Sequence, residues 1–339
     1  MIEGALLEFA IARHPAETIP VDRLDFDDRC LVAGLVATGT PAEAAVAKPS
    51  ASNTGVPAGK ALTKYTGPLT ITTAGTVIDG KAVYGDLKIQ AKNVIIRNSY
   101  LHCGTNIPSG NSGCIDANSG SIYNLQVLNN TIIPDRPSYY RDGIVGHEYT
   151  ARYNHISRTN DGLGIFNKPG GSVNANVTAE YNYIHDLTHW NHDPAHSDGT
   201  HNDGIQVQGG QNITIRNNNV VGSVVAGDGL GTYGTHAASA LIVNQNVAKI
   251  ANMVVDSNWF DCGQNSVCIQ YGKYSNVTVT LQNNHFGRNQ YDFGGGSKYP
   301  IRVNSKSKSS ISGLWTNRWE DNNVLMTEGR DSGIRFMAS

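Results

Sequence analysis

Residues 150–186 read TARYNHISRTNDGLGIFNKPGGSVNANVTAEYNYIHD, and this stretch decides the fold of the chain. It holds the pattern Tyr-Asn-x-Ile twice, with Asn154 and Ile156 in the first copy and Asn182 and Ile184 in the second. The residues between the two copies alternate between apolar and polar and are interrupted by Gly, Asn and Asp. This pattern is typical of short β-strands joined by tight turns. Its recurrence predicts a repeated structural unit.

The same unit recurs from about Lys60 to Leu325, with a polar residue standing two places before an apolar one. The polar column reads Ser99, Asn130, Asn154, Asn182, Asn218, Asn258, Asn284 and Asn322. The apolar column reads Leu101, Ile132, Ile156, Ile184, Val220, Phe260, Phe286 and Val324, after an earlier turn with Lys81 and Val83. The copies are unevenly spaced, as expected of a fixed core that carries loops of variable length.

A parallel β-solenoid explains this repeat. Each coil pairs its strands with those of the next coil, so the main-chain hydrogen bonds run along the axis and the inward apolar residues form one column. Asparagine suits the turn column because it tolerates left-handed backbone angles and because its amide can bond to the equivalent amide one coil away. We therefore predict an all-β chain of about nine coils.

The repeat resembles that of right-handed parallel β-helix proteins, a superfamily of carbohydrate lyases, hydrolases and phage tailspikes. Residues 53–101, NTGVPAGKALTKYTGPLTITTAGTVIDGKAVYGDLKIQAKNVIIRNSYL, are similar to the opening of β-helix domains in secreted actinobacterial proteins and in minor tail proteins of phages that infect those bacteria. The resemblance implies the fold. It implies a function only indirectly, from what other proteins with this fold do. The catalytic patterns of pectate lyases and polygalacturonases are not found in this sequence.

The charge balance and the absence of long apolar runs exclude some classes of function. With 26 Lys+Arg against 28 Asp+Glu, the net charge of −2 argues against a nucleic-acid partner, because phosphate binding needs a clustered excess of basic residues. No apolar run is long enough to cross a membrane, so membrane insertion is not expected. The first residues open with an acid and lack the basic start and apolar stretch of a secretory signal.

The chain divides into four parts. Residues 1–50 lack the solenoid pattern and predict a helix from about Phe26 and a short helix from Pro41, which form either a cap or a segment that docks on other virion proteins. Residues 51–60 predict a linker of small residues, residues 61–325 the β-helix, and residues 326–339 a tail that covers the last coil or meets a neighbour. The sequence leaves the oligomeric state open, with a homotrimer among the alternatives.

The densest polar segment is the insertion HDLTHWNHDPAHSDGTHNDGIQVQGG, which begins at His185. Its imidazoles and carboxylates suit a divalent cation, for which the expected ligands are His192, His196 and Asp193. Alternatively, Asp198, His201 and Asp203 supply the residue types of a carbohydrate-cleaving site. A third interpretation is a polar loop that satisfies its own backbone.

Two further sets of residues are candidates for substrate binding. Asp142, Asp161 and Asp203 each precede a Gly and an apolar residue on successive coils, so they predict a carboxylate ladder that binds a cation or a sugar, although Asp-Gly is also ordinary turn chemistry. Trp190, Tyr139 and Tyr140 offer rings on which a sugar can stack. Tyr153 and Tyr181 occupy matching turn positions and are expected to stack on each other as structural residues.

The cysteines fall at repeated places on the coil. Cys103 and Cys262 both lie four residues after the polar column, and Cys114 and Cys268 both precede an Ile of the next strand. We predict two disulfides that close loops, Cys103–Cys114 and Cys262–Cys268, with Cys30 as a buried thiol. Two disulfides indicate an oxidising exterior.

These observations favour a virion protein, which is made inside the host and later exposed outside it. The leading hypothesis is a tail-associated phage protein whose β-helix presents loops to host surface polysaccharide. The alternatives are a secreted polysaccharide lyase or glycoside hydrolase with its site in the His-rich loop, and a structural or decoration protein without catalysis.

Overall fold

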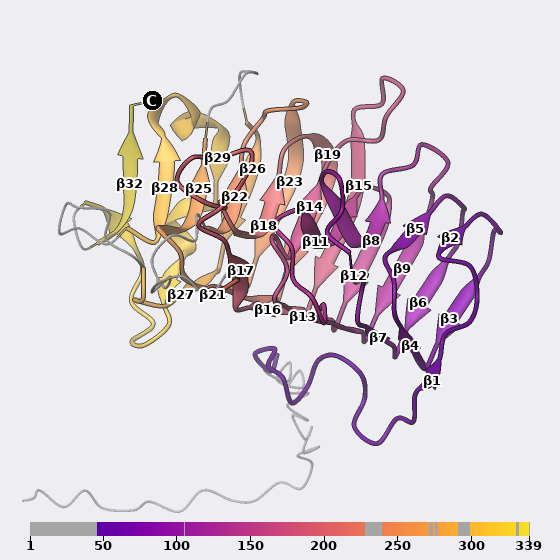
Figure 1. Ribbon diagram of the computed structural model, residues 1–339. Coiled ribbons are helices and arrows are strands. Elements are labelled where there is room, and N and C mark those ends of the chain that lie inside the picture. The colour runs from indigo at the N-terminus through magenta and orange to yellow at the C-terminus, as the bar shows by residue number, and fades with distance from the viewer. Residues whose placement is uncertain are drawn as a thin grey trace, which may run out of the picture. The chain divides into compact units, whose positions relative to one another are not determined.

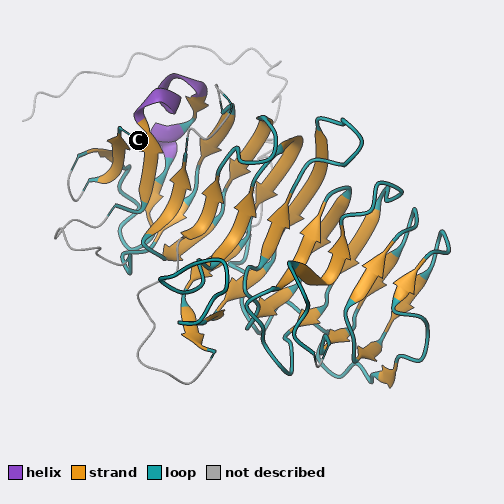
Figure 2. Cartoon of the chain, turned by 45° about the horizontal axis from the view of Figure 1, so that its top comes forward, coloured by secondary structure: helices purple, strands orange, loops and turns teal. Residues whose placement is uncertain are grey.

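The chain folds as a parallel β-solenoid, as the repeat predicts. The computed structural model describes residues 46–104, 106–227, 239–270, 274, 277–290, 299–329 and 332–338. Strands stack side by side from β1 (Thr63–Lys64) to β32 (Gly333–Met337) (Figure 1). The described residues contain no α-helix, only the 3₁₀ turns η1 (Ser305–Ser310) and η2 (Leu314–Thr316) (Figure 2). None of their helices is long and apolar enough to cross a membrane.

Three parallel sheets, here called A, B and C, form the walls of the solenoid. Sheet A contains, in order, β1, β4 (Lys81–Val83), β7 (Tyr100–Leu101), β10 (Thr131–Ile132), β13 (His155–Ser157), β16 (Tyr183–His185), β20 (Asn219–Gly222), β24 (Trp259–Cys262), β27 (His285–Phe286) and β30 (Arg318–Trp319). Sheet B contains β2 (Thr70–Ile71), β5 (Leu87–Ile89), β8 (Ser112–Ala117), β11 (Arg141–Gly146), β14 (Leu163–Ile165), β18 (Asp203–Val207), β22 (Ser239–Val243), β25 (Asn265–Ile269), β28 (Ile301–Asn304), β32 and β31 (Thr327–Glu328).

Sheet C contains β3 (Val77–Asp79), β6 (Ile95–Arg97), β9 (Leu125–Leu128), β12 (Tyr149–Arg152), β15 (Asn174–Glu180), β19 (Gly210–Arg216), β23 (Ile250–Asp256), β26 (Val279–Gln282) and β29 (Ile311–Ser312). A separate parallel pair, β17 (Leu187–His189) and β21 (Val224–Ala226), extends two of the coils. In the C-terminal residues 326–339, β32 pairs with β28 and so adds a strand to sheet B.

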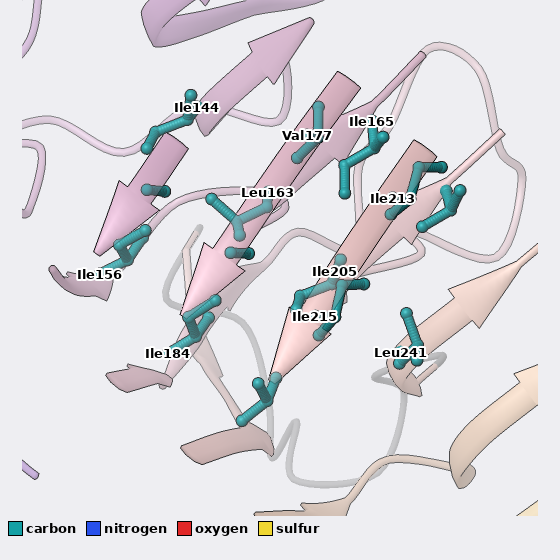
Figure 3. Close-up of a cluster of buried hydrophobic side chains, with 14 of the residues drawn as sticks. Ile144, Ile156, Leu163, Ile165, Val177, Ile184, Ile205, Ile213, Ile215 and Leu241 are labelled. Carbon is teal, nitrogen blue, oxygen red and sulfur yellow. The ribbon is translucent and has the colours of Figure 1, made fainter. Parts of the chain in front are cut away.

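The interior is a stack of apolar side chains held in register (Figure 3). In sheet B, Ile144 pairs with Leu163, Leu163 with Ile205, and Ile205 with Leu241. These side chains are fully buried, and each contributes about 1.5–3 kcal/mol by leaving water. The β-branched residues suit the pleated surface, so the sequence alternation and the core agree.

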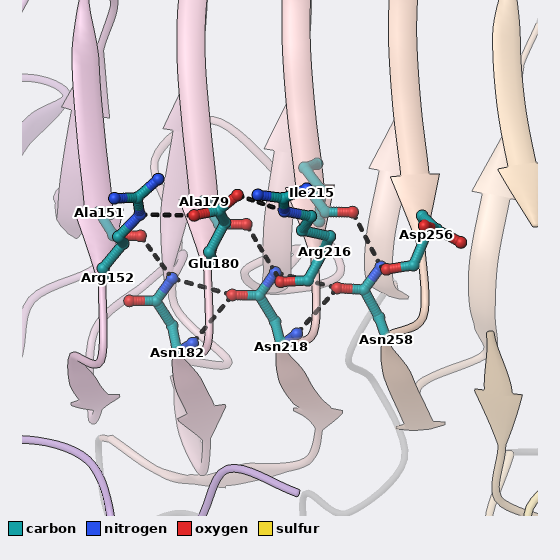
Figure 4. A network of polar contacts seen from close by, with 10 residues as sticks. All are labelled: Ala151, Arg152, Ala179, Glu180, Asn182, Ile215, Arg216, Asn218, Asp256 and Asn258. Carbon is teal, nitrogen blue, oxygen red and sulfur yellow. Dashed lines mark hydrogen bonds and ion pairs between the residues drawn. The ribbon is translucent and has the colours of Figure 1, made fainter. Parts of the chain in front are cut away.

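A ladder of asparagines runs along the turn between sheets C and A, as predicted (Figure 4). The Oδ1 of Asn218 accepts bonds from both the backbone N–H and the Nδ2 of Asn182, each at 2.9 Å. The Nδ2 of Asn182 also donates to the carbonyl oxygen of Ala151 at 2.9 Å. The same contacts recur from Asn130 to Asn284. Each buried amide therefore satisfies its donors and links three coils.

The prediction for the last rung is wrong. Asn317, not Asn322, accepts from the backbone N–H of Asn284, at 3.0 Å. Trp319 then pairs with Phe286 in the apolar column, whereas Val324 is 56% exposed. The motif Asn-x-apolar occurs at both places, but residues 320–324 form a turn in which the Trp319 N–H donates to the carbonyl oxygen of Val324.

Tyr153 and Tyr181 stack as expected, with ring centroids 4.9 Å apart and planes 9° from parallel. Both have positive φ (55° and 57°), at turn positions that Asn98, Asn129 and Asn217 occupy on other coils. Stacking between neighbouring coils offsets the strain that a bulky side chain meets in this region.

Residues 46–62, which include the predicted linker 51–60, lie along the outside of sheet A, and we call them the N-terminal strap. Pro49 accepts from the Nδ2 of Asn219 at 2.8 Å, and the N–H of Gly55 donates to the carbonyl oxygen of Tyr153 at 2.8 Å. The helices predicted near Phe26 and Pro41, and Cys30, fall outside the described residues.

Candidate functional site

A groove of about 520 Å³ lies over the outer face of sheet B. Its floor holds Asp142, Asp161 and Asp203, and Tyr139 and Tyr140 form one side. The loop after β17 contributes Asp193, His196 and His201. Amides that face outward from sheet B and the turns after it continue the lining, at Gln206, Gln208, Asn244 and Gln270. Eight of the eleven residues that the sequence predicts for catalysis, substrate binding or metal therefore gather in one place, together with a set of amides.

The three aspartates form a ladder where the chain enters sheet B. The backbone N–H of Asp161 donates to Oδ1 of Asp142 at 3.1 Å, and that of Asp203 donates to Oδ1 of Asp161 at 2.8 Å. The glycine that follows each aspartate is needed, because a Cβ at Gly143 would lie 2.4 Å from the carbonyl oxygen of Gly162. Two of these pairs lie inside strands β11 and β18, so the glycine permits close packing between coils and the aspartate places one carboxyl group per coil.

Burial makes these carboxyl groups weaker acids than an exposed aspartate. It raises the pKa of Asp142 to about 7 and that of Asp203 to about 8, although hydrogen bonds at each group oppose the rise. Burial also raises the pKa of Asp161, and the neighbouring Asp142 and Asp203 raise it further. Carboxyl groups stacked this closely cannot all ionise, so at neutral pH the ladder retains protons.

Asp203 has the least compensated carboxyl group. Among the described residues, Oδ2 accepts a long bond of 3.4 Å from Nε2 of Gln206. Its Oδ1 is buried without a partner of good hydrogen-bond geometry among the described residues, although the nearby Ser239 backbone lowers its pKa somewhat. The sequence holds one more Asp-Gly-apolar triplet, Asp228-Gly229-Leu230, which falls outside the described residues. On the coil that follows, Ser239 pairs with Asp203 in the register.

The aromatic wall is built differently from the prediction. Tyr139 and Tyr140 contact each other edge to face at 4.6 Å and line the groove. Trp190 packs edge-on against Tyr139 at 6.0 Å but does not line the groove. It supports the tyrosine from behind, and a Cβ on Gly227 would meet its ring at 2.5 Å.

Arg141 anchors this wall, a role that no sequence motif predicts. Its side chain is 1% exposed, pairs with Asp86 through Nε at 2.9 Å, and donates to the carbonyl oxygens of Arg136 and Asn106. Arg136 belongs to the segment that carries the tyrosines, and Asn106 to the loop that brings Asn111 to the groove. The only signal in the sequence was an arginine at the start of a buried strand.

The structure groups the predicted metal and catalytic residues differently from the sequence prediction. Ligand atoms of His196, Asp198 and His201 lie within 4.8 Å of one another, whereas His192 and Asp193 stand apart from this group. Asp193 instead accepts from the N–H of Ala195 through Oδ1 at 2.8 Å, which fixes a turn. Asp198 contacts Nε2 of His201 at 3.2 Å but does not line the groove, whereas Asp203 does.

One of the two predicted disulfides is present, between Cys103 and Cys114. The Cys262–Cys268 prediction is wrong, since both residues are free thiols. The strand register explains the error: Val267, not Ile269, continues the column that runs back through Leu241 to Ile115. Ser266 therefore takes the place of Cys114, and its hydroxyl donates to the carbonyl oxygen of Cys262 at 2.9 Å.

The fold and the groove define a parallel β-helix protein with a polar, partly aromatic cleft on one sheet. No family model matches the sequence, and no curated protein matches it. Among solved structures, the chain is similar to the tailspike protein of E. coli bacteriophage HK620 in two structures, a double mutant and a single mutant, each in complex with a pentasaccharide. The identity is 13% in both, with TM-scores of 0.42 and 0.41. The match covers 73% of this chain and 43% of the tailspike chain, so this chain spans less than half of that protein.

Proposed function

We propose that this protein is a phage tail-associated β-helix that binds host surface polysaccharide in the sheet B groove, with residues 1–50 attaching it to other virion proteins. The glycan-binding part of this proposal is supported by the lining of the groove, which combines two tyrosines with amides and carboxyl groups. The phage assignment rests on the resemblance of residues 53–101 to minor tail proteins.

The lining matches what a sugar chain offers. Sugars present apolar ring faces, which stack on aromatic rings, and hydroxyl groups, which both donate and accept hydrogen bonds. Gln206, Gln208, Asn244 and Gln270 carry amides with both functions. The near-neutral composition fits a neutral partner better than a polyanion.

Binding is tested with purified host cell-wall polysaccharide and the variant Tyr139→Ala/Tyr140→Ala. We expect the double variant to lose at least tenfold in affinity, since each lost stacking contact costs about 0.5–1.5 kcal/mol beyond lost area. Tyr123→Ala is the matched control, because Tyr123 is 56% exposed and lies outside the groove. Binding by the wild type that survives loss of both tyrosines would remove the groove from consideration.

A second function, hydrolysis of the bound glycan, is favoured by the aspartate ladder. Asp203 has the higher pKa and would donate a proton to the leaving oxygen, while Asp142, with the lower pKa, would act as the base. Two strand spacings of about 4.8 Å place these carboxyl groups roughly 10 Å apart, close to the separation of inverting enzymes.

Cleavage is tested by following new reducing ends and the anomer released by the wild type. We expect inversion, and we expect Asp203→Asn to abolish cleavage while keeping glycan affinity, because asparagine cannot supply the proton. A chain that binds the glycan without producing any reducing ends is a non-catalytic recognition protein. Retention of configuration would instead assign neighbouring aspartates.

A further inference from the structure

The loop between β17 and β18 carries a second cluster of polar side chains, separate from the aspartate ladder. Trp190 and Thr200 close its base, with the Thr200 N–H donating to the Trp190 carbonyl oxygen at 2.9 Å and the Trp190 N–H donating to Thr200 Oγ1 at 2.9 Å. Below it, Nδ1 of the buried His189 lies 3.1 Å from the carbonyl oxygen of Thr200. The loop therefore stands on a fixed base.

Two turns inside the loop bring three ligand-type side chains together. The N–H of His196 donates to the carbonyl oxygen of Asp193 at 3.3 Å, and the N–H of Gly199 donates to that of His196 at 3.4 Å. Gly199 has a φ of +94°, and a Cβ there would lie 2.6 Å from the Trp190 carbonyl oxygen. This glycine therefore permits the reversal that returns His201 to His196.

We propose that His196, Asp198 and His201 form a binding site for a divalent transition-metal ion, with Zn²⁺ as the reference ion. One ligand atom from each residue lies within 4.8 Å of the others. The two imidazole rings are stacked at 4.3 Å and 17°, and Nε2 of His201 is 3.2 Å from both carboxylate oxygens of Asp198.

The donor set decides the class of ion. Two imidazoles and one carboxylate suit Zn²⁺ and its neighbours, whereas Ca²⁺ and Mg²⁺ prefer sites made of oxygen alone. Zn–N and Zn–O bonds of about 2.0–2.2 Å require ligand atoms roughly 3.3 Å apart, which the His201–Asp198 contact already meets. All three side chains are exposed, so a small rotation of His196 completes the set without disturbing the core.

The ion would lie at the rim of the groove. His196 and His201 both line the groove that holds the aspartate ladder. Three protein ligands leave at least one position of a tetrahedral ion open, as in zinc sites that bind water or substrate. The open position would face a ligand in the groove, where sugar hydroxyl or carboxylate oxygens can coordinate. The proposed metal site does not depend on the proposed glycan function.

The test is calorimetric titration of the full chain, purified without a histidine tag, with Zn²⁺. We expect saturable binding that weakens at least tenfold in His196→Ala and in His201→Ala. His192→Ala is the matched control, because this exposed histidine of the same loop lies outside the cluster, and its affinity should stay within about twofold of wild type.

Co²⁺ provides a second readout, since its visible spectrum reports tetrahedral coordination by nitrogen and oxygen. Circular dichroism of each variant verifies that the solenoid remains folded. The proposal is overturned if the wild type binds no Zn²⁺ at millimolar concentration, if binding survives His196→Ala/His201→Ala, or if His192→Ala removes it.

Discussion

Asp203 is a buried acid whose pKa lies near 8, and this has a consequence for stability. Between about pH 4 and pH 8 the folded chain keeps this proton while an unfolded aspartate, with a pKa of about 3.9, has lost it. Unfolding then releases a proton, so the free energy of unfolding falls as the pH rises through this window. Below it both states are protonated, and above it neither is.

We expect Asp203→Asn to match the wild type near pH 4 and to be more stable at pH 8, by up to about 5 kcal/mol, because the amide has no proton to lose. Urea denaturation at several pH values measures this difference. Asp198→Asn serves as the control, since its side chain is 58% exposed. A stability difference that is constant with pH would show that the proton on Asp203 is not involved.

At the scale of elements, the loop between β7 and β8 is closed by the Cys103–Cys114 disulfide and brings Asn111 to the groove. We expect reduction to lower the free energy of unfolding by about 3 kcal/mol, the loop-closure value for this length. A Cys262→Ser/Cys268→Ser variant should show the same loss on reduction, because these two thiols form no bond. Thermal denaturation with and without reductant measures both, and a variant insensitive to reductant would contradict the pairing.

The same elements show what the sequence could and could not predict. The asparagine ladder was readable because each rung needs an amide at a fixed distance from an inward apolar residue. The prediction of the last rung is wrong because Asn317 and Asn322 both satisfy that spacing, and only the pairing of Trp319 with Phe286 decides between them. The predicted Cys262–Cys268 disulfide is wrong for the same reason. Val267, two residues before Ile269, continues the apolar column, and this offset moves the Cys268 side chain away from Cys262. In the site, the aspartates followed from the register, but the role of Arg141 depends on two loops that meet only in the folded chain.

At the scale of the whole molecule, the N-terminal strap ties together coils that are not neighbours. A solenoid is otherwise held only by contacts between adjacent coils, so its ends can open separately. Lys48 pairs with Glu320 near the last coil, Pro49 bonds to Asn219, and Gly55 bonds to Tyr153. These contacts couple the middle of the stack to its end and should make unfolding more cooperative.

Two glycines of the strap test this coupling. Gly55 (φ +81°) lies so close to the stack that a Cβ would be 2.6 Å from Thr131 Oγ1 and 3.0 Å from the His155 Cβ, whereas nothing lies within 4 Å of a Cβ at Gly59 (φ +75°). Alanine costs about 1–2 kcal/mol of backbone strain at either position, but only Gly55→Ala adds a clash of about 1–3 kcal/mol that lifts the strap. We expect Gly55→Ala to have the lower melting temperature and a broader transition than Gly59→Ala, together with faster hydrogen exchange at the amides of residues 46–56. Equal transitions in the two variants would mean that the strap lies on the solenoid without coupling its coils.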